Sequence, residues 1–385
     1  MFNYNKKKEN ILIFFFFLIF ILLILSTSLF IKPKYQKNSS LQMKATYAIV
    51  EEISFDNTKG NFDKSKNEYK YQEFKILIKE GKYKGKSYWM RNTIETADVY
   101  NIILKEKDKI LVTITEDENH NINNIHIYDR KRDHNIYLML ILFIFIIIII
   151  GKLQGFKSIL SLVVTGVLII KVLLPLILAG YSPILITTFL SIFIVSFTLI
   201  LISGFNKKSI ASILGTLSGV FISGIISLIV GYSSQITGLA NEDTQQLVYL
   251  LNYPDINFKG ILFAGIIIGS LGAVMDVSIS ISSSLYELKR IKPTIRRKEI
   301  IKSGINIGKD IMGSMSNTLI LAYTGGALEL MLLFMASNMT FKEIINLDIV
   351  CVEIIRGLAG SIGLATTIPL TTLICAYFYD NKFKL

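Results

Sequence analysis

The chain has 385 residues and is rich in apolar residues but poor in charged ones. Hydrophobic residues make up 51% of it, charged residues make up 18%, and the mean hydropathy is +0.51. Soluble domains carry about a quarter charged residues, so this composition excludes an ordinary soluble enzyme. The net charge of +12 is typical either of nucleic-acid-binding proteins or of the cytoplasmic loops of membrane proteins.

Apolar segments that could cross a bilayer occupy the start and the second half of the chain. We predict about eight spans, of which the first is an N-terminal signal anchor. No A-x-A cleavage site follows this first span, and this favours an uncleaved anchor over a secretory signal. The predicted spans are residues 11–31, 136–151, 159–179, 183–203, 209–231, 260–283, 310–336 and 353–378.

The basic residues predict the orientation of these spans. With the N-terminus inside, the inner segments hold sixteen Lys and Arg residues, whereas the short outer loops hold only Lys259 and Lys342. The positive-inside rule then places both termini in the cytoplasm and residues 32–135 outside a multi-pass cell-membrane protein. The densest basic stretch, Lys289 to Lys302, is interpreted as a topology determinant beside anionic lipid. Nothing else in the sequence indicates nucleic acid as a partner.

The polar segment 32–135 predicts a small extracytoplasmic β domain. It holds 20 Lys and Arg residues against 16 Asp and Glu residues. Five or six short strands with turns at 81–85 and 121–124 indicate an OB-like or SH3-like barrel. The expected strands are residues 45–54, 71–79, 86–92, 109–115 and 125–128. The predicted domains are the tail and anchor helix (1–34), the β domain (35–134) and a seven-helix membrane domain (135–385).

The sequence shows no recognisable catalytic or metal centre. His120, His126 and His134 lie near the acidic run 116–118, but their spacing matches no standard metal site, and we interpret them as solvated loop residues. The chain contains no HExxH motif, no paired GxGD-type aspartates and no Walker-type phosphate loop. We therefore predict that the protein is not an enzyme and holds neither a cofactor nor a metal ion.

Seven charged residues lie inside the predicted spans or at their edges, where each ionisable group costs a few kcal/mol and needs a partner or water. Residues near span ends can snorkel, and the i, i+3 spacing of Glu353 and Arg356 suits a local ion pair. Two interpretations stay open for the set: structural ion pairs, such as Lys171 with Glu329 or Asp276, and a polar pathway or binding site. The seven residues are Lys171, Asp276, Lys309, Asp310, Glu329, Glu353 and Arg356.

The surroundings of Asp276 favour a pathway. Ser280 and Ser283 follow it at i+4 and i+7, on one helical face. In the next span, Asp310 and Asn317 share a face at i, i+7. Two helices that each carry an aspartate and a polar stripe are what an aqueous half-channel or an ion site between helices requires. A catalytic dyad would need both aspartates at one depth, which their positions in the spans argue against.

Three long motifs carry a family resemblance. They read GSLGAVMDVSISISSSLYEL (269–288), SGINIGKDIMGSMSNTLILAY (303–323) and VEIIRGLAGSIGL (352–364), the last followed by IPLTT (368–372). Over residues 137–378 the chain resembles the YibE/F family of multispanning bacterial membrane proteins. The outer domain with its turn at 81–85 resembles the longer, YibE-like branch of that family.

The resemblance implies that residues inside the matched motifs are the ones to test. Glu329 stands where family members tend to have a Leu-Pro step, and Lys171 lies outside the motifs, so both are weaker candidates. The two branches commonly occur as pairs, which implies a YibF-like membrane partner; a homo-oligomer is the other arrangement to consider. The candidate pathway residues are Asp276, Ser280, Ser283, Asp310, Asn317, Thr318, Glu353 and Arg356.

Two functions from different classes follow from these observations. The first is a membrane transport protein, an ion-coupled permease or a component of one, that uses intramembrane carboxylates on a substrate the sequence does not identify. The second is a non-transporting assembly or envelope-interaction module that works with a YibF-like partner. The family resemblance brings no settled activity that would decide between them.

Overall fold

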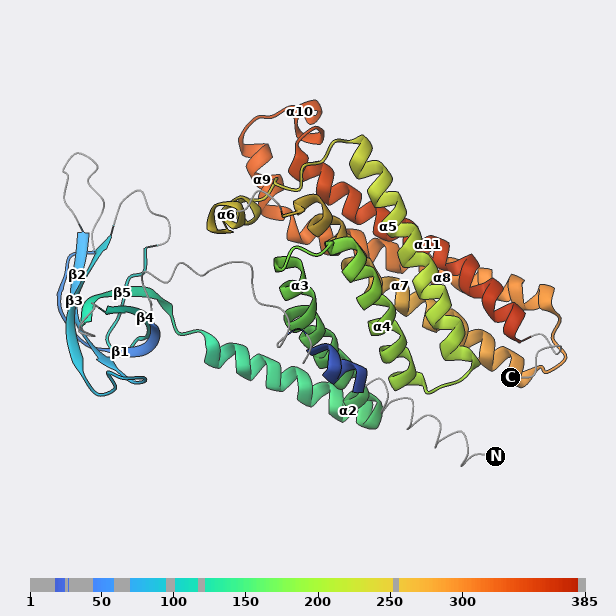
Figure 1. The fold of residues 1–385 in the computed structure, drawn as a ribbon, viewed down its shortest axis with the longest axis horizontal. Coiled ribbons are helices and arrows are strands. Elements are labelled where there is room, and N and C mark those ends of the chain that lie inside the picture. Colours follow the sequence, from blue (N-terminus) through green and yellow to red (C-terminus); the bar gives the residue numbers. More distant parts are fainter. Residues whose placement is uncertain are drawn as a thin grey trace. The chain divides into compact units, whose positions relative to one another are not determined.

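The computed structural model describes residues 18–24, 27, 44–58, 70–94, 101–116, 122–251 and 256–379. The chain contains two compact units (Figure 1). One unit is Gln36–Ile146, and the other consists of Met1–Tyr35 and Ile147–Leu385. Most of the expected anchor at 11–31 lies outside the described residues, as do His120 and the acidic residues 117–118.

The polar unit is built on a five-stranded antiparallel sheet that nearly closes into a barrel. Its strand order is β3-β2-β1-β4-β5, and register shifts in β1 mark bulges, which bend and twist a strand. The expected small barrel is confirmed, and the predicted strand ends lie within three residues of the observed ones. The strands are β1 (Lys44–Asp56), β2 (Lys70–Ile78), β3 (Ser87–Ile94), β4 (Lys109–Glu116) and β5 (Ile122–Arg130).

Two glycines shape the turn between β2 and β3. Gly81 has a φ of 77° and Gly85 a φ of 84°, a region that glycine occupies without steric cost. The Gly85 N–H donates to the Ile78 carbonyl at 2.8 Å. Tyr83 is buried at the tip of the turn and packs in a small apolar cluster with Ile78 and Ile114. The turn expected at 81–85 is confirmed.

The barrel core contains a fully buried polar residue, Gln72. Every second residue of β2 is buried, and Gln72, Phe74 and Ile76 are fully inaccessible. The Gln72 amide donates to the Leu104 carbonyl at 2.9 Å, and its oxygen accepts from the Leu104 N–H at 2.8 Å. These bonds pair both backbone groups of a buried loop residue, as buried polar groups require.

Replacing Gln72 with leucine is expected to lower the free energy of unfolding by about 1–3 kcal/mol, because the buried Leu104 N–H and C=O lose their partners. Thermal unfolding of the full chain can be followed by fluorescence of the single tryptophan, Trp89 on β3. The control is Thr93→Val, at an exposed position of the neighbouring strand β3. A Gln72→Leu transition as late as that of the control would contradict this bonding role.

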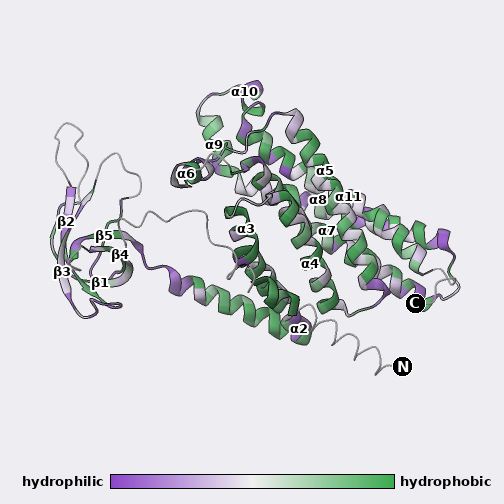
Figure 2. Ribbon diagram, viewed as in Figure 1, coloured by the Kyte–Doolittle hydropathy of each residue, from purple (hydrophilic) through white to green (hydrophobic). Residues whose placement is uncertain are grey.

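The described part of the chain contains five helices that are long and apolar enough to cross a membrane, or six if α8 and α9 form one bent span. Figure 2 shows hydrophobic residues along most of α4 and α5. The first long stretch, Asp133–Leu178, joins α2 (Asp133–Leu168), a π-helical turn (Ile169–Leu173) and α3 (Leu174–Leu178). The others are α4 (Pro183–Ser203), α5 (Lys207–Ser233), α7 (Phe258–Ile291), α8 (Arg297–Gly326), α9 (Leu328–Ala336) and α11 (Asp348–Phe378).

The stretch Asp133–Leu178 consists of two helices that meet at a kink at Lys152, in place of the loop expected at 152–158 between two spans. Only Lys152 leaves the helical conformation, with φ 48° and ψ −125°, and the rest of the expected loop is helical. At 1.5 Å per residue, the helical segments on the two sides of the kink have a combined length of about 69 Å over 46 residues. This is roughly twice the thickness of the hydrocarbon layer, and therefore enough for two spans.

Helices α7 and α8 both extend beyond the spans that hydropathy predicts. The inner loop is expected at 284–308, but only residues 292–296 are non-helical, since α7 ends at Ile291 and α8 begins at Arg297. Hydropathy marks where a helix becomes polar, not where it ends. The span expected at 310–336 is bent by 57° between α8 and α9. Two short helices, α6 (Glu242–Leu251) and α10 (Phe341–Ile345), occupy expected outer loops.

The centre of the helical unit is formed by α5, α7 and α11, which pack against one another (Figure 1). A Cβ atom added to Gly219 on α5 would overlap the Thr367 side chain and lie 2.8 Å from the Gly363 carbonyl oxygen, both on α11. Small residues that permit such close approach are typical of helix interfaces in membranes, where apolar burial gives little driving force.

Candidate functional site

Helix α7 carries Asp276 on a face that points away from the core of the helical unit. Val274 and Val277, on either side of it, are fully buried, whereas Asp276 and Ser280 are exposed. Asp276 is therefore a surface residue of this chain, although its helix is apolar enough to span a membrane. The same exposed stripe continues toward the start of α7 through Gly272, Gly269 and Gly265.

The serines that follow Asp276 lie on two different faces. Of the two predicted residues, Ser280 is exposed with Asp276 and Ser283 is half-buried. The neighbouring Ser278 and Ser282, which the prediction left out, are fully buried. Their spacing from the apolar residues 274, 277 and 281 places them on the core face, and this periodicity is the signal in the sequence that could have identified them.

The buried serines connect three helices by hydrogen bonds. The Ser212 hydroxyl on α5 donates to Ser282 at 2.9 Å. Ser278 donates to the Ser212 carbonyl at 2.8 Å, and its hydroxyl lies 3.0 Å from that of Thr371 on α11. Because these groups satisfy one another inside a tightly packed interface, they hold α5, α7 and α11 together rather than line an open path.

Helix α8 presents Asp310, Asn317 and Thr318 on an uncovered surface, and all three are exposed. The Thr318 hydroxyl donates to the carbonyl four residues earlier at 2.9 Å, which is a local helix bond. Within the part of the chain that the structure describes, the side chains of Asp310 and Asn317 form neither a hydrogen bond nor an ion pair. The buried residues of this helix are Ile300, Gly304 and Gly308.

Helices α7 and α8 are neighbours and meet at Gly269 and Tyr323. A Cβ atom added to Gly269 would lie 2.8 Å from the Tyr323 hydroxyl, and one added to Gly357 on α11 would lie 3.7 Å from the Tyr323 ring. Tyr323 thus packs between two glycines on different helices. The exposed polar stripes that contain Asp276 and Asp310 consequently belong to adjacent helices.

Glu353 and Arg356 form an ion pair within α11, with a nitrogen–oxygen distance of 2.7 Å. Their side chains are only 24% and 28% exposed, respectively. The i, i+3 ion pair expected from the sequence is confirmed. The Tyr323 hydroxyl is close enough to interact electrostatically with both groups, so the pair lies near the contact between α8 and α11.

A double-mutant cycle is expected to give a coupling free energy of roughly 1–2 kcal/mol for this pair, because partial burial places it between exposed and buried ion pairs. The variants are Glu353→Gln, Arg356→Met and the double substitution, with unfolding in SDS titration as the measurement. The exposed i, i+3 pair Glu287–Arg290 on α7 is the matched control, with an expected coupling below about 0.5 kcal/mol. Equal coupling in both pairs would contradict the role of burial.

Arg356 also borders a cavity of about 240 Å³ beside Asn241 and Thr244. Two more hollows have largely apolar walls. The one of about 280 Å³ is lined by α4, α5 and α7, and the one of about 350 Å³ is lined by α2, the π-helical turn, α4 and α7. None of these three cavities is lined by Asp276 or Asp310. The candidate residues of α7 and α8 therefore lie on exposed faces of two adjacent helices, whereas Glu353 and Arg356 form a paired unit on α11, with Arg356 beside the same cavity as Gly265.

The two weaker candidates are both exposed. Lys171 lies in the π-helical turn after α2, and Glu329 lies in the first turn of α9. Among the described residues, Lys171 forms no ion pair with Glu329 or with Asp276. Structural pairing of Lys171 with either carboxylate, one of the two interpretations that the sequence left open, is therefore not what the structure shows.

Family models match most of the chain. The model of the YibE/F-like protein family matches residues 139–381, and that of the YibE/F family N-terminal domain matches residues 40–129. The chain belongs to the YibE/F family. The second match covers the barrel of this YibE/F protein, and the first covers the helices that carry every candidate residue. No curated protein and no solved structure matches the chain.

Proposed function

We propose that this YibE/F protein is a subunit of an ion-coupled membrane transport system whose path runs along α7 and α8. The observation that supports the proposal is that these adjacent helices carry Asp276 and Asp310 on exposed faces. A carboxylate that faces lipid costs a few kcal/mol. Water or a second protein must therefore cover this surface when the helices lie in a membrane.

We further propose that a YibF-like membrane protein supplies the opposite wall of the path. Three glycines on α7 and α8, Gly265, Gly272 and Gly313, have open space where a side chain would be. Small residues of this kind allow a helix of another protein to approach closely. A second copy of this chain could occupy the same surface, and mass measurement of the purified complex distinguishes the two partners.

The proposed orientation follows the distribution of basic residues, with both termini in the cytoplasm and the barrel outside. In this orientation Asp276 lies in the half of α7 nearer the cytoplasm, because α7 runs from an outer loop to the basic segment 289–302. An ion that moves along α7 and α8 would meet the exposed stripe of glycines, then Asp276 and Ser280.

The test is ion flux in proteoliposomes. The chain is co-expressed with its YibF-like partner, reconstituted, and compared with each protein alone under an imposed pH or sodium gradient. Proton movement is read from a trapped pH-sensitive dye, and sodium movement from a sodium-sensitive dye. We expect flux from the pair that exceeds the flux of either protein alone. Flux no greater than that of empty liposomes under both gradients would contradict the proposal.

The assembly module is the second candidate, and a specific observation favours it. Asp276 and Asp310 line none of the three cavities. The exposed faces of α7 and α8 that carry them therefore suit a closed interface with another protein as well as they suit an ion path. This function is supported if the two proteins copurify as a stable complex that carries no flux. A complex that conducts ions, and loses conduction without losing assembly when Asp276 is changed, excludes it.

A further inference from the structure

The outer surface of the barrel carries a group of aromatic and charged residues on β1, β2 and β3, with Tyr71 and Glu73 half-buried and the others exposed. We call it the ring patch, and it consists of Phe55, Tyr71, Glu73, Trp89 and Arg91. Trp89 is the single tryptophan of the chain and is 58% exposed, and Phe55 is 44% exposed. Large exposed aromatic side chains on a small polar domain indicate a contact surface.

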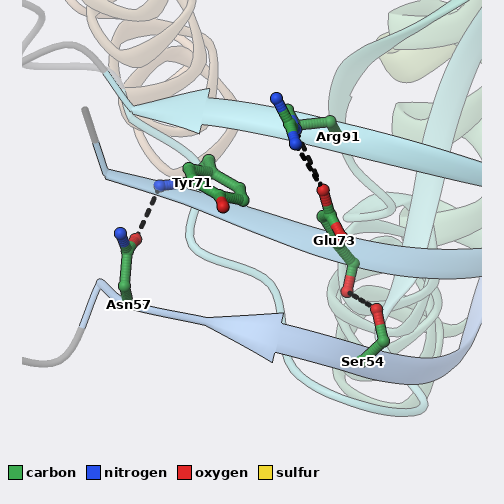
Figure 3. Close-up of polar contacts among 5 residues, drawn as sticks. All are labelled: Ser54, Asn57, Tyr71, Glu73 and Arg91. Atoms are coloured by element: carbon green, nitrogen blue, oxygen red, sulfur yellow. Dashed lines mark hydrogen bonds and ion pairs between the residues drawn. The ribbon is translucent and has the colours of Figure 1, made fainter.

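The ring patch has an ordered geometry, and Figure 3 shows Tyr71, Glu73 and Arg91 of the patch with their polar contacts. The rings of Phe55 and Tyr71 are stacked, with centroids 5.0 Å apart and planes 28° from parallel. The Arg91 guanidinium lies 4.4 Å from the centroid of the Tyr71 ring, so the three side chains form a continuous surface. Hydrogen bonds fix the backbone beneath it: the Tyr71 N–H donates to Asn57 at 2.7 Å, and the Ser54 hydroxyl donates to the Glu73 carbonyl at 3.1 Å.

Trp89 extends the ring patch along β3. Exposed and less exposed residues alternate in this strand, which places Trp89 and Arg91 on the same outer face. Tyr71 pairs with Thr93 in the sheet register, four residues from Trp89. At 3.3 Å per residue the two rings are about 13 Å apart along the strand. The patch therefore suits an extended ligand of several units better than a single small molecule.

The charges of the ring patch are paired with each other, and two charged residues beside the patch are paired as well. Arg91 binds Glu73 at 2.6 Å, and Lys75 lies 3.8 Å from Glu51. Positive and negative charges are therefore balanced among these four described residues, whereas binding of phosphate-rich nucleic acids requires an excess of positive charge. The ring patch offers instead a guanidinium and a carboxylate held side by side next to flat apolar rings, so that hydrogen-bond donors, acceptors and ring faces are all available to one ligand.

We propose that the ring patch binds a neutral, hydroxyl-rich glycan chain on the outer side of the membrane. Sugar rings have C–H faces that pack on aromatic rings, which combine a large apolar surface with little conformational freedom. Sugar hydroxyls both donate and accept hydrogen bonds, as the Arg91–Glu73 pair requires. This inference does not depend on ion transport, and its outcome leaves the proposed function untouched.

The experiment uses Trp89 as its own reporter. The full chain in lipid nanodiscs is titrated with two probes, the β-1,4-linked hexamers of N-acetylglucosamine and of glucose, while tryptophan emission is recorded. We expect a saturable change in emission with at least one hexamer and none with a charged control, a DNA hexamer. Absence of a saturable change with both sugar hexamers would overturn the proposal, as would an equal response to DNA.

Variants separate the ring patch from other surfaces. Tyr71→Ala and Arg91→Gln are each expected to weaken hexamer binding at least tenfold while Trp89 still reports. Tyr128→Ala removes another exposed aromatic residue, on β5, and should leave binding unchanged. An equal loss in Tyr128→Ala would show that the effect is not specific. Quenching of Trp89 by brominated lipid, with no response to sugar, would assign the patch to the lipid surface and overturn the proposal.

Discussion

Valine in place of Gly219 is expected to prevent stable packing of α5 against α11. Even a Cβ atom at this position would overlap the Thr367 side chain and approach the Gly363 backbone, and backbone cannot move aside as a flexible side chain can. Overpacking usually costs 1–3 kcal/mol, and we expect a loss above about 3 kcal/mol here because two helices would have to separate. The measurement is thermal unfolding in detergent together with the yield of monodisperse protein.

Gly166 provides the matched control for this substitution. It lies inside α2, and a Cβ atom there would meet nothing within 4 Å. Gly166→Val therefore introduces the same side chain into a helix without a steric conflict, and we expect nearly normal yield and unfolding temperature. If both variants behave alike, the close approach of α5 and α11 is not what holds the helical unit together.

Replacing Asp276 with asparagine is expected to reduce ion flux through the reconstituted pair at least tenfold. Asparagine has nearly the same shape but can neither carry a negative charge nor exchange a proton. Because Asp276 is exposed and has no ion-pair partner among the described residues, the substitution should leave folding intact. Flux is measured in proteoliposomes, and assembly is measured by copurification with the YibF-like partner.

Glu329→Gln is the matched control, since it also neutralises one exposed carboxylate but lies on α9, away from α7. We expect its flux to remain within about twofold of the unchanged protein. Loss of copurification in Asp276→Asn, with flux never detected in any variant, would instead support the assembly module. Normal flux in Asp276→Asn would eliminate α7 as the path.

The barrel follows closely from the sequence because its signals are local. Alternating apolar residues in β4 and the glycines of the turn after β2 act over a few residues, and each expected strand is present. The helices are less well predicted at their ends. Hydropathy cannot distinguish a helix that continues into polar surroundings from one that stops, and α7 and α8 both continue.

In the candidate site, too, contacts within one helix are predicted from the sequence, whereas contacts between helices are not. The Glu353–Arg356 pair depends on spacing within one helix, and it was predicted correctly. The distinction between Ser280, which shares the exposed face of Asp276, and Ser278, which bonds α5 and α11, depends on which face the other helices cover. Spacing from Asp276 alone does not contain that information, although the apolar periodicity of α7 does.

The most direct test is whether water reaches the surface of α7 around Asp276 in the complex of this chain with its YibF-like partner. Ser280→Cys and Ile225→Cys are made after Cys351 and Cys375 are replaced with serine; both positions are exposed in this chain, and Ile225 lies on an apolar surface of α5. We expect a charged, membrane-impermeant thiol reagent to label Ser280→Cys but not Ile225→Cys. Labelling of neither would show that the surface is closed by protein or lipid, and would contradict a transport path along α7 and α8.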